Sequence, residues 1–375
     1  MLAKNRVIIN YIILYLVFMT SFLLLNNDSE FEMPNISFSK ETKETEEVII
    51  EKSYHPDFVR GLYLTAYSAG SDEYRQNIIA NMKDSKINTV VIDIKDYSGY
   101  ILYNSQIQEL KDIEATKNRM PELKKIIDEF HQENIYVIAR QTVFQDPVLA
   151  RAKPELAFQT YNGNTWYDNK GLAWVSPVKQ EVWEYNLAIA KEATELGFDE
   201  INFDYMRFPS DGNMAALNYK LPEGQTKSEV MKSFFIYLSN NLSEETTISI
   251  DTFGLVLDNV ASGYDLNIGQ KLTDMVNYFD YICPMMYPSH YPLQYLGYEN
   301  SAEHPGHVIS YGLSISSEAM KDKRAKLRPW IQAFHLRAFY YQDKIEAQEI
   351  AVEKATTTEG WLLWNARNYY PTYIF

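Results

Sequence analysis

Cysteine, paired histidines and nucleotide-binding motifs are scarce or missing in this chain of 375 residues. The single cysteine, Cys283, excludes an internal disulfide framework and a multi-cysteine metal site. The six histidines are scattered, and no HExxH or HxH pair occurs, which argues against a zinc enzyme. We therefore expect neither a metal ion nor a cofactor.

Positive charge is also in short supply. Lys and Arg number 35 against 50 Asp and Glu, which gives a formal net charge of −15. Nucleic acids and anionic membrane surfaces both attract basic patches, so this balance argues against either as a partner. Hydrophobic residues make up 46% of the chain and aromatic residues 14%, which suits one large α/β domain or two medium ones.

The N-terminus carries a targeting signal. Lys4 and Arg6 precede an uncharged run from Val7 to Leu25, which is long enough to span a bilayer with its basic flank in the cytoplasm. No A-x-A cleavage site and no lipobox cysteine follow this run. We therefore predict that residues 1–26 form an uncleaved signal anchor, with a cleaved signal peptide as the alternative.

The next segment, residues 27–55, is polar and charged and has no sustained periodicity, so we predict a linker. Under either interpretation of the N-terminus, the remaining domain, residues 56–375, lies outside the cytoplasm. It is then held at the cytoplasmic membrane by the anchor, or secreted if the segment is cleaved.

Strand and helix patterns alternate through this domain. Amphipathic helices are predicted between the strands, and only the segment around residues 301–323 has a weak helix signal. Eight such strands predict a (β/α)8 TIM barrel rather than an open doubly wound sheet, because no GxGxxG or Walker turn follows an early strand. The predicted strands are 59–67, 88–96, 135–144, 198–208, 246–254, 280–287, 327–334 and 360–368.

Polar side chains collect at the C-terminal ends of the predicted strands, where barrels of this kind place their active sites. Because side chains alternate across a strand, Ile92 and Ile94 facing outward would leave Asp93 and Lys95 facing inward. The same parity turns Asp204 and Asp251 inward. The candidate residues in strand order are Asp93, Lys95, Asp96, Arg140, Asn202, Asp204, Arg207, Asp251, Tyr287, His290, Gln332 and Trp364.

Each carboxylate also has a purely structural interpretation. Asp93 could pair with Lys95 to fill the barrel, Asp204 could pair with Arg207, and Asp251 could bond neighbouring strand ends, because a buried carboxylate needs a partner. The convergence of three carboxylates on one mouth favours a site. A pair of carboxyl groups is the machinery of glycoside hydrolysis, in which one donates a proton and the other is the nucleophile or activates water.

The long connection between residues 145 and 177 suits a sugar substrate, because aromatic faces can stack on pyranose rings. It carries Tyr161, Trp166, Tyr167 and Trp174. These rings could equally cap the barrel.

With these motifs assembled, the chain resembles the DUF4015 family of glycoside hydrolase domains, which is similar to α-amylase-like and other glycosidase barrels. The resemblance covers about residues 57–370, and its most specific part is the combination of INFDYMRFP with PMMYPSHY. The other stretches that carry it are VRGLYLT, NTVVIDIKDYSG, IYVIARQTVFQDP, SIDTFG, RPWIQAF and GWLLWN.

The resemblance implies a TIM barrel with glycosidase activity. Amylase-like enzymes place a nucleophilic aspartate at the end of strand four and the acid/base at the end of strand five, and Asp204 and Asp251 match these positions. The acid there is usually glutamate, so Asp251 departs from the pattern. A further aspartate expected on strand seven is absent, because Gln332 is followed by Ala333.

We expect a membrane-anchored glycoside hydrolase that acts on a cell-surface or exported polysaccharide or its oligosaccharides. Asp204 would be the nucleophile or base and Asp251 the acid, and the other ten candidates, together with Trp174 of the long connection, would bind or orient the sugar. A non-catalytic carbohydrate-binding protein on a degenerate barrel is the alternative. A metal-dependent deacetylase or phosphoesterase would need a His/Asp cluster, for which only His290 and His335 lie near predicted strand ends.

Overall fold

The computed structural model describes residues 54–242 and 246–375. The predicted anchor, residues 1–26, and all of the predicted linker except Tyr54 and His55 lie outside the described residues. Every helix within the described part of the chain is too short or too polar to span a bilayer.

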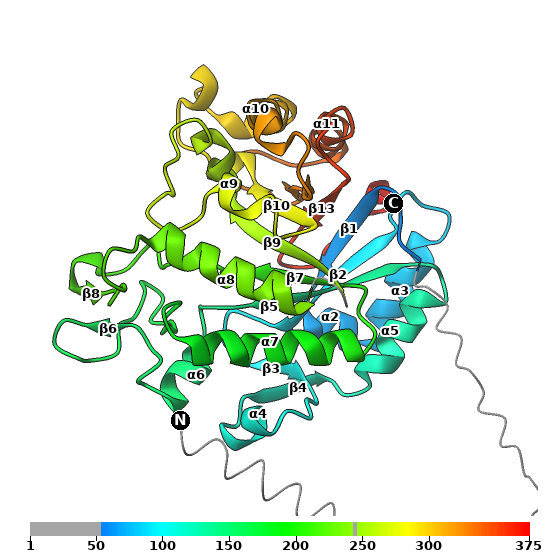
Figure 1. Cartoon of the computed structure of the whole chain (residues 1–375). Helices are drawn as coiled ribbons and strands as arrows, with labels where there is room; N and C mark the ends of the chain where they lie inside the picture. Colours follow the sequence, from blue (N-terminus) through cyan, green and yellow to red (C-terminus); the bar gives the residue numbers. More distant parts are fainter. Residues whose placement is uncertain (1–53, 243–245) are drawn as a thin grey trace, which may run out of the picture. The chain divides into compact units, whose positions relative to one another are not determined.

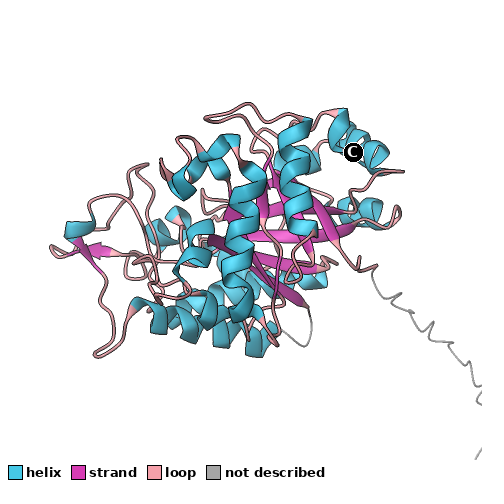
Figure 2. Ribbon diagram, turned by 90° about the horizontal axis from the view of Figure 1, so that it is seen from above, coloured by secondary structure: helices cyan, strands magenta, loops and turns pink. Residues whose placement is uncertain are grey.

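Eight parallel strands close into a barrel, which confirms the predicted (β/α)8 fold (Figures 1 and 2). Each barrel strand pairs with the barrel strand that follows it in the chain, and β1 closes the ring by pairing with both β13 and β2. Every predicted strand contains one of them. The strands are β1 (Val59–Leu64), β2 (Thr89–Lys95), β5 (Tyr136–Thr142), β7 (Glu200–Asp204), β9 (Thr247–Phe253), β10 (Tyr281–Met286), β12 (Trp330–Gln332) and β13 (Gly360–Trp364).

Helices cover the outside of the barrel, as Figure 2 shows from above. The main ones are α3 (Asp72–Met82), α5 (Leu123–His131), α7 (Gln180–Glu195), α8 (Lys227–Leu242), α10 (Pro305–Met320) and α11 (Gln342–Glu353). Shorter ones are α2 (Ala66–Gly70), α4 (Gln108–Asp112), α6 (Pro147–Ala152) and α9 (Leu272–Met275).

Helix α10 occupies the segment for which the sequence gives a weak helix signal. Two glycines and four serines lower its intrinsic propensity, since glycine and serine are weaker helix formers than alanine or leucine. Val308, Ile309, Leu313 and Met320 are nevertheless buried against the domain. Tertiary packing of this face therefore outweighs local propensity.

Additional short strands decorate the barrel. They are β3 (Ile101–Tyr103), β4 (Thr116–Met120), β6 (Gln159–Thr160), β8 (Leu217–Asn218) and β11 (Lys326–Leu327). The connection after β5 carries β6 and the one after β7 carries β8, and these two strands pair as an antiparallel ribbon. Both connections leave the C-terminal ends of barrel strands, so the ribbon marks the mouth side, on the left in Figure 1.

Two separate apolar clusters follow from alternation along the strands. The larger lies between the strands and the helices. The smaller fills the barrel interior and includes Tyr63, Tyr136, Cys283 and Trp330. Deep in this interior a fully buried ion pair joins Arg328 Nη1 to Glu200 Oε2 at 2.7 Å.

The seam between β1 and β13 depends on a glycine. Gly360 pairs with Val59 and has φ +134°, a value that side-chain-bearing residues rarely adopt. A Cβ atom there would lie 2.4 Å from the Val59 carbonyl oxygen. The absence of a side chain therefore lets the last strand approach the first and close the barrel.

Candidate active site

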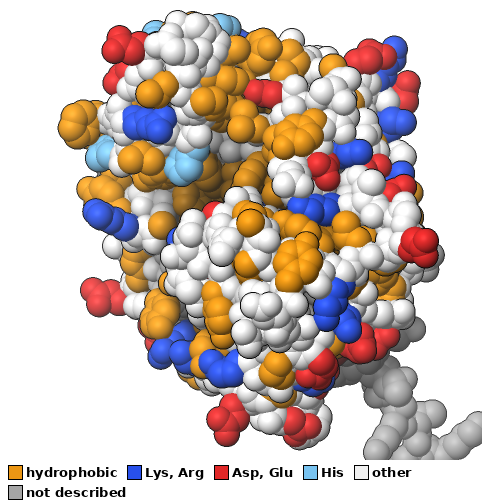
Figure 3. All heavy atoms as spheres, turned by 90° about the vertical axis from the view of Figure 1, so that its left-hand side faces the viewer, with side chains coloured by type: hydrophobic (Ala, Val, Ile, Leu, Met, Phe, Trp, Pro, Cys, Tyr) orange, Lys and Arg blue, Asp and Glu red, His pale blue; other side chains and the backbone are white. Residues whose placement is uncertain are grey.

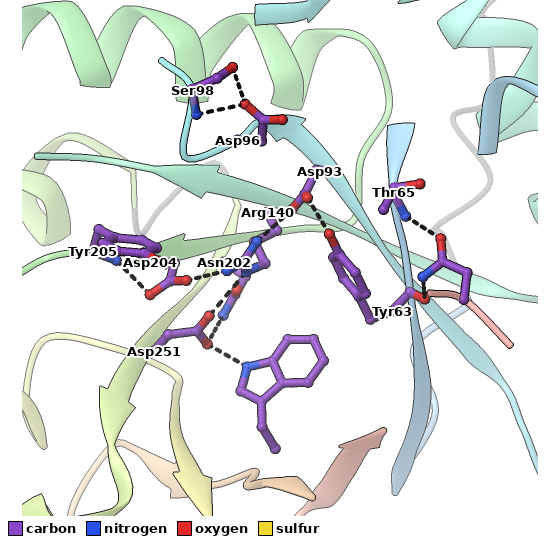
Figure 4. Close-up of polar contacts among 12 residues, drawn as sticks. Tyr63, Thr65, Asp93, Asp96, Ser98, Arg140, Asn202, Asp204, Tyr205 and Asp251 are labelled. Atoms are coloured by element: carbon purple, nitrogen blue, oxygen red, sulfur yellow. Dashed lines mark hydrogen bonds and ion pairs between the residues drawn. The ribbon is translucent and has the colours of Figure 1, made fainter. Parts of the chain in front are cut away.

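Three carboxylates surround one guanidinium at the mouth end of the barrel (Figure 4). Arg140 Nη1 donates to Asp93 Oδ1 at 2.6 Å, Nη2 donates to Asp204 Oδ2, and Nε donates to Asp251 Oδ2 at 3.4 Å. All four side chains are at least nine-tenths buried. The convergence predicted from strand parity is therefore observed, with Arg140 at its centre.

The register of the sheet produces this convergence. Asp93 pairs with Arg140, Arg140 with Asn202, and Asn202 with Ser249, so these residues form one layer across four strands. Asp204 and Asp251 lie two residues further along their strands, on the same inward face. One layer thus supplies the arginine, and the layer above it supplies two of its carboxylate partners.

Asp204 ends β7, and both of its oxygens accept hydrogen bonds. Oδ2 accepts from Arg140, and Oδ1 accepts from the backbone N–H of Tyr205 at 2.6 Å. Tyr205 has φ +53°, a left-handed conformation that costs free energy for a residue with a side chain. Its ring packs edge-on against Trp174, with centroids 5.7 Å apart. The turn that aims Asp204 is thus held by the long connection after β5.

Asp251 on β9 is enclosed by hydrogen-bond donors. Its Oδ1 accepts from Trp330 Nε1 at 2.7 Å and from Asn202 Nδ2 at 2.9 Å. Burial, followed by the negative charge of Asp204, raises the pKa of Asp251 to about 8, and Arg140 and the two donors oppose the shift only in part. At neutral pH the neutral acid is therefore the favoured form of this group.

Asp93 on β2 is held from two sides. Its Oδ2 accepts from Tyr63 Oη at 2.5 Å, while Arg140 binds Oδ1. Burial raises the pKa of Asp93, and the charge of Arg140 opposes that shift. The Tyr63 ring stacks on Trp364 with centroids 4.0 Å apart, and the Arg140 guanidinium carbon lies 5.0 Å from the Trp364 ring centroid. Trp364 is therefore the aromatic wall of the cluster.

A cavity of about 710 Å³ begins at this wall. Trp364 and Tyr287 line it, and so do the side chains of His290 and His335. Figure 3 looks onto the side of the domain that carries β6 and β8 and shows a hollow bordered by hydrophobic side chains, with histidines beside it. The volume of the cavity lies within the range of about 300–1,000 Å³ that is common for small-molecule sites.

Lys95 does not face the mouth, so its expected inward orientation is wrong. The pairing of β2 with β5 shifts by one residue between Asp93 and Lys95, which is a β-bulge. A bulge inserts an extra residue and resets the alternation of side chains. Lys95 Nζ instead lies 2.8 Å from Asp146 Oδ2 and 5.4 Å from the Tyr185 ring of α7, outside the barrel. It pairs with Asp146, and Asp93 pairs with Arg140.

Asp96 and Gln332 lie near the cluster but have local partners. Asp96 follows β2 and accepts hydrogen bonds from the backbone N–H and the hydroxyl of Ser98. It lies away from Arg140 (Figure 4). Gln332 ends β12; its Oε1 accepts from the backbone of Ser289 and its Nε2 donates to Phe334. Both side chains brace turns at the mouth.

Arg207 makes no ion pair with Asp204 among the residues described; its guanidinium instead lies among three aromatic rings. Its Cζ atom is 4.9 Å from the centroid of Trp174, 5.2 Å from Tyr205 and 4.7 Å from Phe253. Burial lowers the pKa of Arg207. Trp174 is itself 1% exposed, so its ring supports Tyr205 and Arg207 and offers no open face to a sugar.

Tyr63 and Trp330 belong to the site but were not predicted from the sequence. The alternation of VRGLYL already carried a signal for Tyr63, because outward-facing Leu62 and Leu64 leave it facing inward. Trp330 carries the same signal, because outward-facing Ile331 leaves it facing inward, but its hydrogen bond to Asp251 joins strands that lie far apart in the chain. His290 and His335 form no metal cluster: no group of three or more His, Cys, Asp and Glu side chains in the described part of the chain is arranged to hold a metal ion.

The site can therefore present a protonated carboxyl beside a carboxylate that is oriented by an arginine and a backbone N–H. Such a pair can donate a proton to a leaving oxygen and attack, or activate water toward, the carbon that oxygen leaves. An aromatic-lined cavity adjoins the pair. This is chemistry suited to splitting a glycosidic bond.

Comparisons with known proteins identify a family for this chain. The family model DUF4015, described as "Putative glycosyl hydrolase domain", matches residues 61–370. A search of curated proteins gave no match. A hypothetical protein from Ruminiclostridium thermocellum is 40% identical over 51% of this chain and 96% of that chain, with a TM-score of 0.48.

Two glycosidase structures share the fold at low sequence identity. The PgaB (BpsB) glycoside hydrolase domain from Bordetella bronchiseptica is 12% identical, with a TM-score of 0.61, over 83% of this chain and 95% of that one. The α-galactosidase TtGalA from Thermus thermophilus is 9% identical, with a TM-score of 0.54, over 85% of this chain and 64% of that one. At these identities the likeness shows the fold alone.

Proposed function

The chain belongs to the DUF4015 family, and from this premise we propose that it is a glycoside hydrolase. The proposed substrate is a cell-surface or exported polysaccharide, or oligosaccharides derived from it. Asp204 and Asp251 are the reacting carboxyl groups. The observation that carries this proposal is the difference between their surroundings: a raised pKa at Asp251, and two charge-stabilising donors on Asp204.

In the proposed reaction Asp251 gives its proton to the glycosidic oxygen as the bond to the anomeric carbon breaks. Asp204 either attacks that carbon or removes a proton from the water that does. Arg140 orients Asp204 and keeps negative charge favourable there. Asp93 and Tyr63 in turn hold Arg140 and the Trp364 wall in place. The proton lost by Asp251 is recovered from water at the end of the cycle.

Hydrolysis and its pH profile test the proposal together. The full chain is incubated with cell-wall and exopolysaccharide fractions from the organism that encodes it, and new reducing ends are measured between pH 5 and pH 10. We expect release at neutral pH and a fall in kcat/KM above about pH 8, because the acid must be protonated and Asp251 loses its proton there. Heat-denatured protein is the control.

Two results would count against this reading. Activity that stays constant up to pH 10 would remove Asp251 from the role of acid. Saturable binding of a fraction with no release at any pH would favour the second candidate, a non-catalytic carbohydrate-binding barrel. That candidate is supported by the Asp251 side chain, which has 0% of its surface exposed, and by Ala333, which lines the cavity next to Gln332, where the family resemblance leads one to expect an acid.

The proposed location is outside the cytoplasm, held at the cytoplasmic membrane by residues 1–26. The uncharged run from Val7 to Leu25 behind Lys4 and Arg6 supports this location. In fractionated cells the full chain is expected with the membranes, and a chain that lacks residues 1–26 is expected to lose membrane association. Recovery of the full chain in the soluble fraction, with its N-terminus intact, would contradict the anchor.

A further inference from the structure

The cavity beside the carboxylate cluster differs in charge from the rest of the molecule. The chain has a net charge of −15, yet no Asp or Glu is among the residues that line this cavity. Arg367 is the lining residue that carries a full charge. Among lining residues that otherwise carry no full charge, this cation attracts an anionic group and disfavours a cationic one.

The guanidinium of Arg367 is free to bind. It makes no hydrogen bond and no ion pair with the residues described, and the residue is exposed. Its backbone is nonetheless fixed, because the Arg367 N–H donates to Asn365 Oδ1 at 3.0 Å. Asn365 in turn donates to the carbonyl oxygens of Ala333 and Tyr369. The Arg367 side chain thus extends from a loop whose backbone is held by hydrogen bonds.

The walls of the cavity suit a pyranose ring. Tyr341, Tyr369 and Phe334 line it, together with Trp364 at the carboxylate cluster. His335 Nδ1 accepts from the backbone of Tyr340 at 3.0 Å, so the proton of the neutral ring sits on Nε2, which is then a donor. Aromatic faces for the ring, and an arginine and a histidine donor for its substituents, are the groups that an acidic sugar requires.

We propose that this cavity is a subsite for a sugar that carries a carboxylate, and that Arg367 recognises that carboxylate. The inference rests on the proposed glycosidase function: a polysaccharide bound in this cavity would continue past Trp364 to Asp204 and Asp251. The substrate class is then an acidic polysaccharide. A guanidinium binds a carboxylate through two parallel hydrogen bonds, which neither a neutral sugar nor an amino sugar can accept in the same way.

Binding, measured without turnover, tests the assignment. The probes are oligosaccharides of galacturonate, glucuronate and mannuronate, each paired with its carboxyl-reduced form, which has the same rings without the charge. Affinities are measured by calorimetry on the full chain, in a detergent without a sugar headgroup. We expect at least one acidic probe to bind about tenfold or more tighter than its reduced form, and Arg367→Gln to remove that preference.

Arg119→Gln is the matched control, because it removes the same charge from an exposed arginine on β4. It is expected to keep the preference. Equal affinity for the acidic and reduced forms in all three pairs overturns the assignment, as does a preference that survives Arg367→Gln. If the protein prefers the acidic probes but hydrolyses none of the substrates, this inference stands and the proposed glycosidase function is contradicted. Hydrolysis without acid preference would do the reverse.

Discussion

Asp204→Asn is expected to lower kcat by at least about 10³-fold, because an amide can neither attack the anomeric carbon nor activate water. The rest of the site should persist. The Tyr205 N–H can still donate to the amide oxygen, and Arg140 keeps its bonds to Asp93 and Asp251. Reducing-end assays of the purified full chain measure the loss, and thermal denaturation shows that the variant is folded.

The same substitution should also move the titration of Asp251. The charge of Asp204 is the second-largest cause, after burial, of the raised pKa of Asp251, so its removal lowers that pKa. Asp274→Asn is the matched control, since Asp274 pairs with Lys232 on the outer helices at 3.2 Å. If Asp204→Asn keeps activity within tenfold of the wild type while remaining folded, Asp204 is not the nucleophile or base.

Arg140→Met is expected to destabilise the fold by about 3–5 kcal/mol at pH 8, because it leaves three buried carboxyl groups without their cation. Methionine has a similar length and no charge, so the change is mainly electrostatic. The ion pairs to Asp93, Asp204 and Asp251 are all lost together. Urea denaturation of the wild type and the variant measures the difference in the free energy of unfolding.

The pH dependence of this loss has a definite sign. Burial already raises the pKa of Asp93 and Asp251, and Arg140 opposes both shifts, so its removal raises the two folded-state pKa values further. A group whose pKa is raised by folding stabilises the fold below its unfolded pKa, and that stabilisation is lost as pH rises through the folded pKa. The loss in the free energy of unfolding caused by Arg140→Met should therefore shrink toward pH 4 and grow toward pH 9.

A second substitution separates charge from packing. Adding Asp93→Asn to Arg140→Met removes one of the buried carboxylates that has lost its ion pair, and it should recover part of the lost stability at pH 8. Packing loss alone would give a deficit that is independent of pH and is not relieved by Asp93→Asn. An unfolding midpoint for Arg140→Met equal to that of the wild type would show that the cluster does not depend on its arginine.

Alternation within single strands was enough to predict much of the site. The inward placement of Asp93, Asp204 and Asp251 follows from the outward apolar residues beside them, because successive side chains point to opposite faces of a strand. The parallel order of eight strands then brings three such ends to one mouth. Both steps rest on the geometry of the backbone and on short-range patterns.

The sequence by itself therefore determined the barrel, its strands and the three carboxylates at its mouth. Only the tertiary structure decided which cation serves them. A one-residue bulge in β2 turns Lys95 outward to Asp146, and Arg140 from the neighbouring strand takes the central position. The local pattern cannot specify this choice, because a bulge and a buried ion pair depend on contacts between strands and helices that lie far apart in the chain.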